Sequence, residues 1–254
     1  MKLSDRLMRA QIFFFFCIIS IVISCTSTTT RGLSSRSTIQ SDPLVQGFSR
    51  LATASVSDAV DQVVGERGFM SHEIKPVFRT RLCGRAVTVL AQPSAESQPP
   101  AMALEVIDTA EPGSILVIVM DGADGADIAA FGGIMCTGAV ARGLGGAVFD
   151  GGCRDVAEIE AMNFPVFARG IVPSTSVGRY INVSSNEPVL CGDVEVEPGD
   201  ILVGDADGVV VVPHEHAAAV LRRAQELEAQ EAETAQKVKE LKSVRKAIEA
   251  TRRI

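Results

Sequence analysis

The segment at positions 150–155 reads DGGCRD, and it follows the apolar run GAVF that begins at Gly146. Glycine tolerates positive φ angles and lets a ligand approach the backbone closely. Arg154 offers a planar fork of donors for a carboxylate or an enolate oxygen, and Asp155 offers the hard oxygen that Mg²⁺ and Mn²⁺ prefer. The residues at this strand end could therefore bind an anionic, oxygen-rich ligand together with its metal.

A helix start is the simpler explanation of the same pair. Asp155 would then be the N-cap of the next helix, with Arg154 solvated beside it, because aspartate is common at helix starts. Cys153 could alternatively be a nucleophile, since a neighbouring arginine lowers a thiol pKa. No histidine lies near it in the sequence to act as its base, so we interpret it as an incidental thiol.

A second pair of glycines favours the binding interpretation. In AAFGGIMCTGAVARG, Gly132 and Gly133 open a helix whose free N–H groups at Gly133, Ile134 and Met135 could bind a carboxylate. Tight helix packing would explain this pair taken alone. Two glycine-opened segments one crossover apart are more easily explained as the walls of one pocket.

The elements that must position these residues alternate between strand and helix. A parallel sheet with right-handed crossovers is expected from this alternation, and DGGCRD would lie at its carboxyl edge, where open α/β sheets bind ligands. The predicted order is strand ILVIVM from Ile115, helix 128–142, strand AVF, helix 156–162 and strand PVFA.

The flanking segments complete an α/β domain. Asp42 and Pro43 look like an N-cap and first helical residue, helical spacing continues to Gly65, and GRAVTVLAQP predicts a strand. After Pro173 short strands and turns predict antiparallel or mixed pairing. From Pro213 the chain reads as one long helix with acids early and bases late, which suits the helix macrodipole.

Composition sets the domain organisation and excludes one function class. The 254 residues, 46% of them hydrophobic, suffice for one sizeable core. With a net charge of −7, no Trp and one Tyr, the chain lacks the basic surface and aromatic platform of a nucleic-acid binder. We expect a targeting segment at 1–25, a Ser/Thr-rich linker at 26–43, a catalytic domain at 44–212 and a C-terminal helix at 213–254.

The N-terminal segment has the features of a targeting signal. Basic residues precede the apolar run at 12–24, which suits a signal-peptide h-region and is short for a membrane span. VISC, ending at Cys25, would also serve as a lipoprotein cleavage box, whereas the acid-free stretch after it is typical of organellar transit segments. Organelle targeting, export and membrane anchoring all remain open, and any membrane contact is expected only through this segment.

The remaining cysteines and histidines give little further signal. No CxxC spacing is present, so neither a zinc site nor a redox motif is indicated. His214 and His216 open the final helix and are expected at the surface, and no role is assigned to His72.

Most of the sequence resembles a known family. The segment from GGIM through ARGLGGAVFDGGCRDVAEIEAMNFPVF, followed by GDILVGDADGVVVVP, resembles the RraA-like family. That family includes 4-hydroxy-4-methyl-2-oxoglutarate aldolases, oxaloacetate decarboxylases and the regulator of RNase E activity. The resemblance extends from about Leu51 to about Glu231 and includes VSDAVD and GRAVTV.

The resemblance implies a fold, an assembly and a site. The fold would be a single β/β/α swivelling domain, here with a long C-terminal helix. The assembly would be a homotrimer or a dimer of trimers with active sites between subunits. The pyruvyl group of a 2-oxo acid would be held by the backbone of Gly132, Gly133, Ile134 and Met135 and by Arg154, and Mg²⁺ or Mn²⁺ by Asp155.

One residue departs from the aldolase pattern. The family's well-studied aldolases carry an acid twenty-one positions before the arginine, where it orders a water on the metal, and here that position is Gly133. Aspartates in MDGADGADIAA could compensate, but their spacing does not fit an EF-hand and solvated turn residues explain them better. The candidates are Asp121, Asp124 and Asp127.

The family resemblance, together with Arg154 and Asp155, predicts a metal-dependent carbon-carbon lyase of the class II type that releases pyruvate from 2-oxo acids. No lysine lies in either motif, so a Schiff-base mechanism is disfavoured. Retro-aldol cleavage needs a base for the 4-hydroxyl and decarboxylation of oxaloacetate does not, so Gly133 favours decarboxylation. The alternatives are a non-catalytic regulator that binds a ribonuclease or another protein, and a structural trimer without activity.

Overall fold

The computed structural model describes residues 42–252. The expected targeting segment and most of the linker lie outside them. Within 42–252, no helix is both long enough and apolar enough to cross a membrane.

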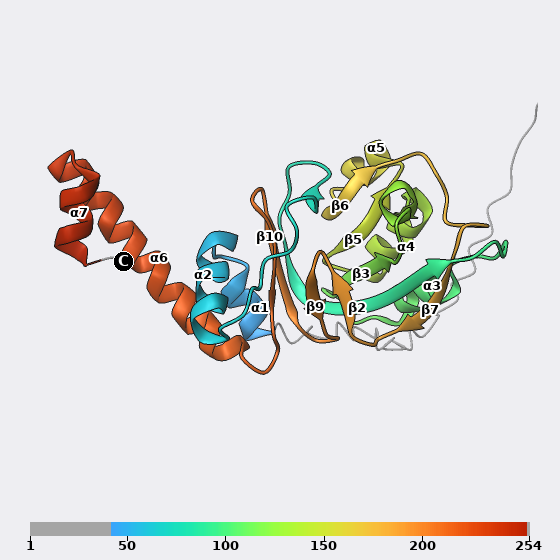
Figure 1. Cartoon of the computed structure of the whole chain (residues 1–254), viewed down its shortest axis with the longest axis horizontal. Helices are drawn as coiled ribbons and strands as arrows, with labels where there is room; N and C mark the ends of the chain where they lie inside the picture. Colours follow the sequence, from blue (N-terminus) through green and yellow to red (C-terminus); the bar gives the residue numbers. More distant parts are fainter. Residues whose placement is uncertain (1–41, 253–254) are drawn as a thin grey trace, which may run out of the picture. The chain divides into compact units, whose positions relative to one another are not determined.

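A parallel sheet forms the centre of the fold, as the alternating pattern predicted (Figure 1). Its central strand β3 is buried along its whole length, which explains its uninterrupted apolar sequence. The strand order in the main sheet is β1-β6-β5-β3-β2-β10-β11. The parallel strands are β2 (Leu82–Pro93), β3 (Ile115–Met120), β5 (Gly146–Cys153) and β6 (Val166–Ile171).

The strands after Pro173 pair antiparallel, also as predicted. β7 (Tyr180–Ser185) and β10 (Ile201–Asp205) each pair antiparallel with β2, and β11 (Gly208–Val212) pairs with β10. A separate hairpin joins β8 (Val189–Cys191) to β9 (Val194–Val196), and β1 (Lys75–Pro76) pairs with β6. The result is a mixed α/β fold.

Different layers cover the two faces of the sheet. Alternate residues of β3 belong to two separate apolar clusters, because successive side chains of a strand point to opposite faces. One cluster contains residues of the helices α3 (Ala101–Thr109), α4 (Gly133–Arg142) and α5 (Val156–Ala161). The other contains residues of β8 to β11. The helical layer is therefore the one that carries both glycine-opened segments.

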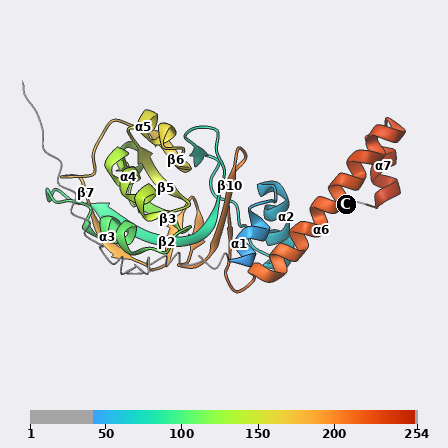
Figure 2. The same ribbon diagram turned by 180° about the vertical axis from the view of Figure 1, so that it is seen from behind.

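A third apolar cluster lies where three helices pack on β10 and β11 (Figure 2). These helices are α1 (Pro43–Phe48), α2 (Thr53–Val63) and α6 (Ala217–Leu241). The predicted helix start at Asp42 is confirmed, because the Asp42 side chain accepts hydrogen bonds from the N–H groups of Leu44 and Val45 at the start of α1. The first residues of α2 bond to carboxylates from distant segments: the Ala52 N–H donates to Glu228, and the Thr53 N–H and hydroxyl donate to Asp205.

Two expected helices differ in the structure. The helix predicted for 128–142 begins at Gly133, because residues Ala129–Phe131 form strand β4, which pairs with β5. Short apolar runs of this kind suit a strand as well as a helix. The single helix expected after Pro213 is interrupted: Lys242 adopts a left-handed conformation, and Ser243 caps a further helix, α7 (Val244–Thr251).

Candidate functional site

The two glycines at the end of β5 serve packing. Neither Gly151 nor Gly152 has a positive φ, which corrects the expectation from the sequence. A β-carbon on Gly151 would lie 2.5 Å from the side chain of Met120, and one on Gly152 would overlap Val172 and lie 3.1 Å from the carbonyl oxygen of Ile128. The glycines allow β5 to pass close to its neighbours before the chain turns.

The left-handed conformation falls on Asp155 instead, at φ 58° and ψ 35°. Asp155 occupies the N-cap position of α5, as the helix-start interpretation required, but its side chain makes no capping bond to α5. Its Oδ2 accepts the backbone N–H of Gly133 at 2.9 Å. Aspartate tolerates this backbone region better than most residues, and the turn directs its carboxylate to the start of α4.

Arg154 is held in place by backbone carbonyls. Its own N–H donates to Phe131 at 3.1 Å, its Nη1 donates to the carbonyl of Ser174 at 3.2 Å, and its Nε lies 3.6 Å from Asp155 Oδ2. Nη2 makes no hydrogen bond to the described residues, and the side chains of Arg154 and Asp155 are each 43% exposed. The guanidinium is therefore oriented and still has donors to offer a ligand.

The start of α4 lies directly against this pair, as the sequence predicted. A β-carbon on Gly132 would lie 2.7 Å from Asp155 Oδ2 and 3.0 Å from Arg154 Nε, so a larger residue there would push both side chains aside. The Cys136 N–H bonds back to Gly132 (3.0 Å), and the N–H groups of residues 133–135 precede that bond. Because Asp155 takes the Gly133 N–H, Ile134 and Met135 are the remaining backbone donors for a ligand carboxylate.

The free oxygen of Asp155 suits a divalent cation whose remaining coordination positions are filled by the ligand and by water. Both polar contacts of the Asp155 carboxylate involve Oδ2, and Oδ1 accepts no hydrogen bond from residues 42–252. Within that range no group of three or more His, Cys, Asp or Glu residues could enclose a metal ion. Mg²⁺ commonly keeps several waters and binds through one or two carboxylates plus its substrate. Asp155 fits this arrangement, and a closed protein cage is not formed.

Other residues considered from the sequence lie elsewhere or are unreactive. Asp124 and Asp127 line a hollow with Tyr180 that neither Arg154 nor Asp155 reaches. Cys153 is fully buried, and its burial raises the pKa of the thiol to about 12, which excludes a thiolate nucleophile near neutral pH.

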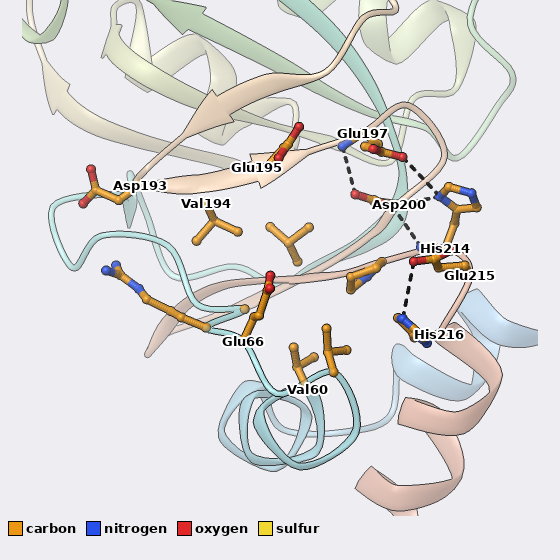
Figure 3. A pocket seen from close by; sticks show the side chains of 15 residues that line it. Val60, Glu66, Asp193, Val194, Glu195, Glu197, Asp200, His214, Glu215 and His216 are labelled. Atoms are coloured by element: carbon orange, nitrogen blue, oxygen red, sulfur yellow. Dashed lines mark hydrogen bonds and ion pairs between the residues drawn. The ribbon is translucent and has the colours of Figure 1, made fainter.

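The C-terminal histidines belong to a different hollow, of about 660 Å³ (Figure 3). The Nδ1 atom of His214 lies 3.1 Å from Oδ1 of the buried Asp200, and the backbone N–H of His214 also bonds to that oxygen. His216 lies beside Glu215. These contacts fix the turn into α6, and none of them reaches Arg154 or Asp155.

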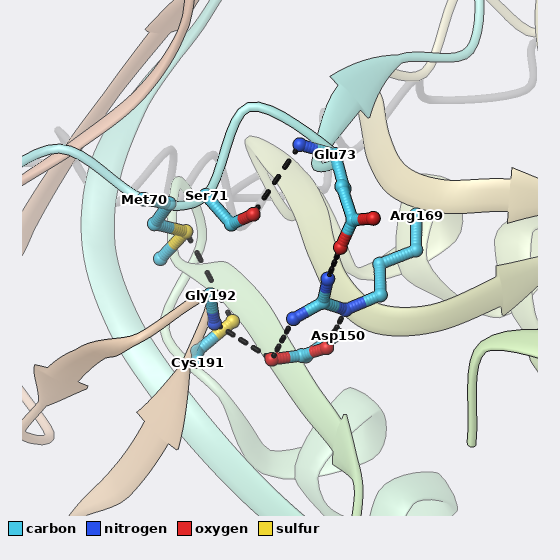
Figure 4. Close-up of polar contacts among 7 residues, drawn as sticks. All are labelled: Met70, Ser71, Glu73, Asp150, Arg169, Cys191 and Gly192. Atoms are coloured by element: carbon cyan, nitrogen blue, oxygen red, sulfur yellow. Dashed lines mark hydrogen bonds and ion pairs between the residues drawn. The ribbon is translucent and has the colours of Figure 1, made fainter. Parts of the chain in front are cut away.

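Asp150 has a structural role that was not anticipated from the sequence (Figure 4). Its carboxylate accepts hydrogen bonds from Arg169 on β6 and from the Gly192 N–H in the β8–β9 turn (2.7 Å), and Arg169 also pairs with Glu73. The hydrogen bond that Arg169 donates to Asp150 is the main reason why the pKa of Arg169 is raised. The only hint in the sequence was that opposite charges occur on consecutive strands of a parallel sheet.

The fold and the arginine-aspartate pair define a mixed α/β protein whose candidate ligand site lies at the carboxyl edge of a parallel sheet. The profile of the RraA-like family, described as Aldolase/RraA, matches residues 53–211, and the chain belongs to that family. A protein of Halalkalibacterium halodurans with the provisional name 4-hydroxy-4-methyl-2-oxoglutarate aldolase is 34% identical over 183 residues, which cover 72% of this chain and 82% of that protein.

Solved structures agree with this membership. An uncharacterised protein from Pseudomonas syringae superimposes with a TM-score of 0.71 at 31% identity, covering 80% of this chain and 96% of that one. RraAS2 of Streptomyces coelicolor, described as an unusual member of the RNase ES inhibitor RraA protein family, gives a TM-score of 0.65 at 27% identity. That match covers 74% of this chain and 93% of RraAS2.

Proposed function

We propose that the protein is a divalent-metal-dependent lyase that releases pyruvate from 2-oxo acids, by decarboxylation of oxaloacetate, by retro-aldol cleavage of 4-hydroxy-4-methyl-2-oxoglutarate, or by both. The observation that carries the proposal is the convergence of the Arg154 guanidinium and the Asp155 carboxylate on the N-terminus of α4. The aldolase name of the Halalkalibacterium relative supports a lyase at the level of the family.

The residues of the site have separate tasks in this reaction. The N–H groups of Ile134 and Met135 would bind the carboxylate of the substrate, because the first turn of a helix favours an anion. Nη2 of Arg154 would donate to the 2-oxo oxygen, which becomes an enolate oxygen as the bond between carbons 3 and 4 breaks. A Mg²⁺ or Mn²⁺ ion held by Asp155 would supply Lewis acid stabilisation of the same charge.

The exposure of the site supports an assembly. A pair of side chains that are each 43% exposed leaves the reacting atoms open to water, whereas a lyase gains from excluding it. We therefore expect a homotrimer or a dimer of trimers in which a neighbouring subunit covers Arg154. Mass photometry of the full chain measures this directly, and a fully active monomer would exclude an intersubunit site.

Pyruvate release by the purified full chain tests the proposed activity. Each substrate is supplied with Mg²⁺, with Mn²⁺ or with EDTA, and lactate dehydrogenase reports the pyruvate formed. We expect metal-dependent release that EDTA abolishes. Equal release in EDTA would argue against the metal, and no release from either substrate would argue against a lyase.

A non-catalytic regulator is the second candidate, since a fold does not fix a function. The similarity to RraAS2, which is described in terms of inhibition of a ribonuclease, favours it. Inhibition of an RNase E type enzyme by the purified chain, in the absence of any pyruvate release, is the result that would select this alternative.

A further inference from the structure

Gly133 is the position at which the sequence lacks the acid of the family's well-studied aldolases, and the structure fills the space beside it. A β-carbon on Gly133 would overlap Oε2 of Glu158, and it would lie 3.3 Å from Cδ of Glu158 and 3.5 Å from Cβ of Asp155. The carboxylate of Glu158 therefore occupies the volume that a side chain at 133 would fill.

The backbone of α5 explains why Glu158 reaches this place. Asp155 turns the chain in a left-handed conformation, and the Glu158 N–H then bonds to the Asp155 carbonyl at 3.0 Å in the first turn of the helix. Side chains on a helix point back toward its N-terminus, so Glu158 is directed toward Asp155 and the start of α4. The same helix start that attracts a ligand carboxylate favours an acidic side chain there.

The carboxylate of Glu158 has no partner among the described residues and could therefore contact a substrate. Glu158 is exposed, and its side chain forms no hydrogen bond or ion pair with the residues at 42–252. A structural role in capping or pairing would have left such a contact. Its position beside Asp155, without a partner of its own, suits a group that meets the substrate.

We propose that Glu158 supplies the second carboxylate of the site and orients the 4-hydroxyl of a 4-hydroxy-2-oxo acid for cleavage. This inference rests on the proposed lyase function and adds the residue that positions the hydroxyl of the cleaved substrate. In the cleavage step the hydroxyl proton passes to a water held by Glu158 Oε2 and on to solvent. The O–H bond pair left on the oxygen forms the carbonyl of the departing 2-oxo acid as the C3–C4 bond breaks, and the C3–C4 pair forms the enolate that Arg154 stabilises. Protonation of carbon 3 from solvent then gives pyruvate.

A catalytic role for Glu158 changes the expected effect of Gly133→Asp on the cleavage reaction. From the sequence alone, this substitution would restore a missing acid and favour cleavage over decarboxylation. In the structure its side chain would displace Glu158 and add a third carboxylate beside Asp155, and like charges this close repel. We therefore expect Gly133→Asp to raise cleavage only when the Glu158 carboxylate is removed in the same protein.

The test removes the carboxylate of Glu158 and then places a new carboxylate at position 133, both in the full chain. At saturating Mn²⁺, Glu158→Ala and Glu158→Gln should lower cleavage of 4-hydroxy-4-methyl-2-oxoglutarate by about 10²-fold, the usual contribution of a positioned acid-base group, and change oxaloacetate decarboxylation by less than about threefold. The double variant Gly133→Asp/Glu158→Ala should recover most of the lost cleavage. Glu160→Ala, an exposed glutamate on the same helix, is the matched control and should leave both rates unchanged.

Binding of Mn²⁺ without substrate gives a second readout, by electron paramagnetic resonance titration. Glu158→Gln should weaken it by about fivefold, the effect of one nearby charge in partly screened surroundings, whereas Asp155→Ala should abolish it. Loss of binding in both variants would make Glu158 a metal ligand and overturn the proposed role.

The activity results separate the two proposals. If the parent releases pyruvate from neither substrate, the lyase function fails and this inference fails with it. If the parent decarboxylates oxaloacetate but does not cleave the aldol substrate, or if both Glu158 variants cleave it at the parent rate, only the role of Glu158 is overturned. Failure of the double variant to recover cleavage, with its fold and assembly intact, would also overturn it.

Discussion

Replacing Asp150 with asparagine tests how firmly the end of β5 is anchored. The Asp150 side chain is 15% exposed and that of Arg169 is 20% exposed, so their ion pair is largely removed from water. Asparagine keeps one oxygen for the Gly192 N–H but loses the charge and the second acceptor. Arg169 would be left with Glu73, which is 60% exposed and much weaker as a partner.

The magnitude follows from the burial of the pair. Removing one partner of a fully buried ion pair costs about 3–5 kcal/mol, and the remaining exposure together with Glu73 place Asp150→Asn near the lower end, at about 3 kcal/mol. For a domain of this size, that corresponds to a fall in Tm of about 6–12 °C. The matched control, Glu73→Gln, should cost about 1 kcal/mol or less, because it removes an exposed partner.

Circular dichroism melts and urea titrations of the parent, Asp150→Asn and Glu73→Gln measure these differences. Since β5 leads directly into Arg154 and Asp155, pyruvate release at a temperature where the variant is folded should also fall. A Tm of Asp150→Asn within about 2 °C of the parent, less than 1 kcal/mol, would refute the idea that this ion pair anchors the strand.

Three further predictions concern single side chains. Arg154→Lys should lower kcat/KM by at least about tenfold, because lysine keeps the charge but loses the planar fork, and near-parent kinetics would exclude a role for the fork. Cys153→Ala should retain activity, and the native thiol should resist iodoacetamide at pH 7.5, because burial raises its pKa to about 12; rapid labelling of Cys153 would contradict this. Burial raises the pKa of Asp205, but the hydrogen bonds from Thr53 and Asp207 outweigh it and the pKa is lowered. The stability that Asp205 contributes is therefore present above its unfolded pKa of about 4 and lost as the pH falls through its folded pKa. The difference in unfolding free energy between the parent and Asp205→Asn should shrink below about pH 4, and a difference that grows on acidification would refute the assignment.

Much of the fold could be predicted from the sequence because its strands and helix starts are marked by short local patterns. The uninterrupted run ILVIVM predicts a strand buried on both faces, and Asp42 before Pro43 predicts a helix start that the structure contains. The proximity of Gly132 and Arg154 was predicted from two glycine-opened segments one crossover apart, which are best explained as walls of one pocket, although strand β4, which leads into Gly132, was predicted as helix. The distance from Gly132 to Arg154 in sequence does not weaken that inference.

The details that could not be predicted depend on tertiary contacts. The close fit of Gly151 and Gly152 is set by Met120 and Val172, which belong to other segments. The resemblance to the family's aldolases also led to the expectation of an acid where this sequence has Gly133, but which side chain fills the space depends on how α5 crosses the start of α4. No periodicity in the sequence encodes that crossing.

The central claim is that Asp155 holds the metal on which turnover depends, and Asp155→Asn tests it most directly. Asparagine tolerates the left-handed backbone of this position and can still accept the Gly133 N–H, so the fold and assembly should persist while the charge is lost. The account predicts that Mn²⁺-dependent pyruvate release falls by at least about 10²-fold, a loss of several kcal/mol of transition-state stabilisation. Metal-dependent turnover of Asp155→Asn at the parent rate would contradict it.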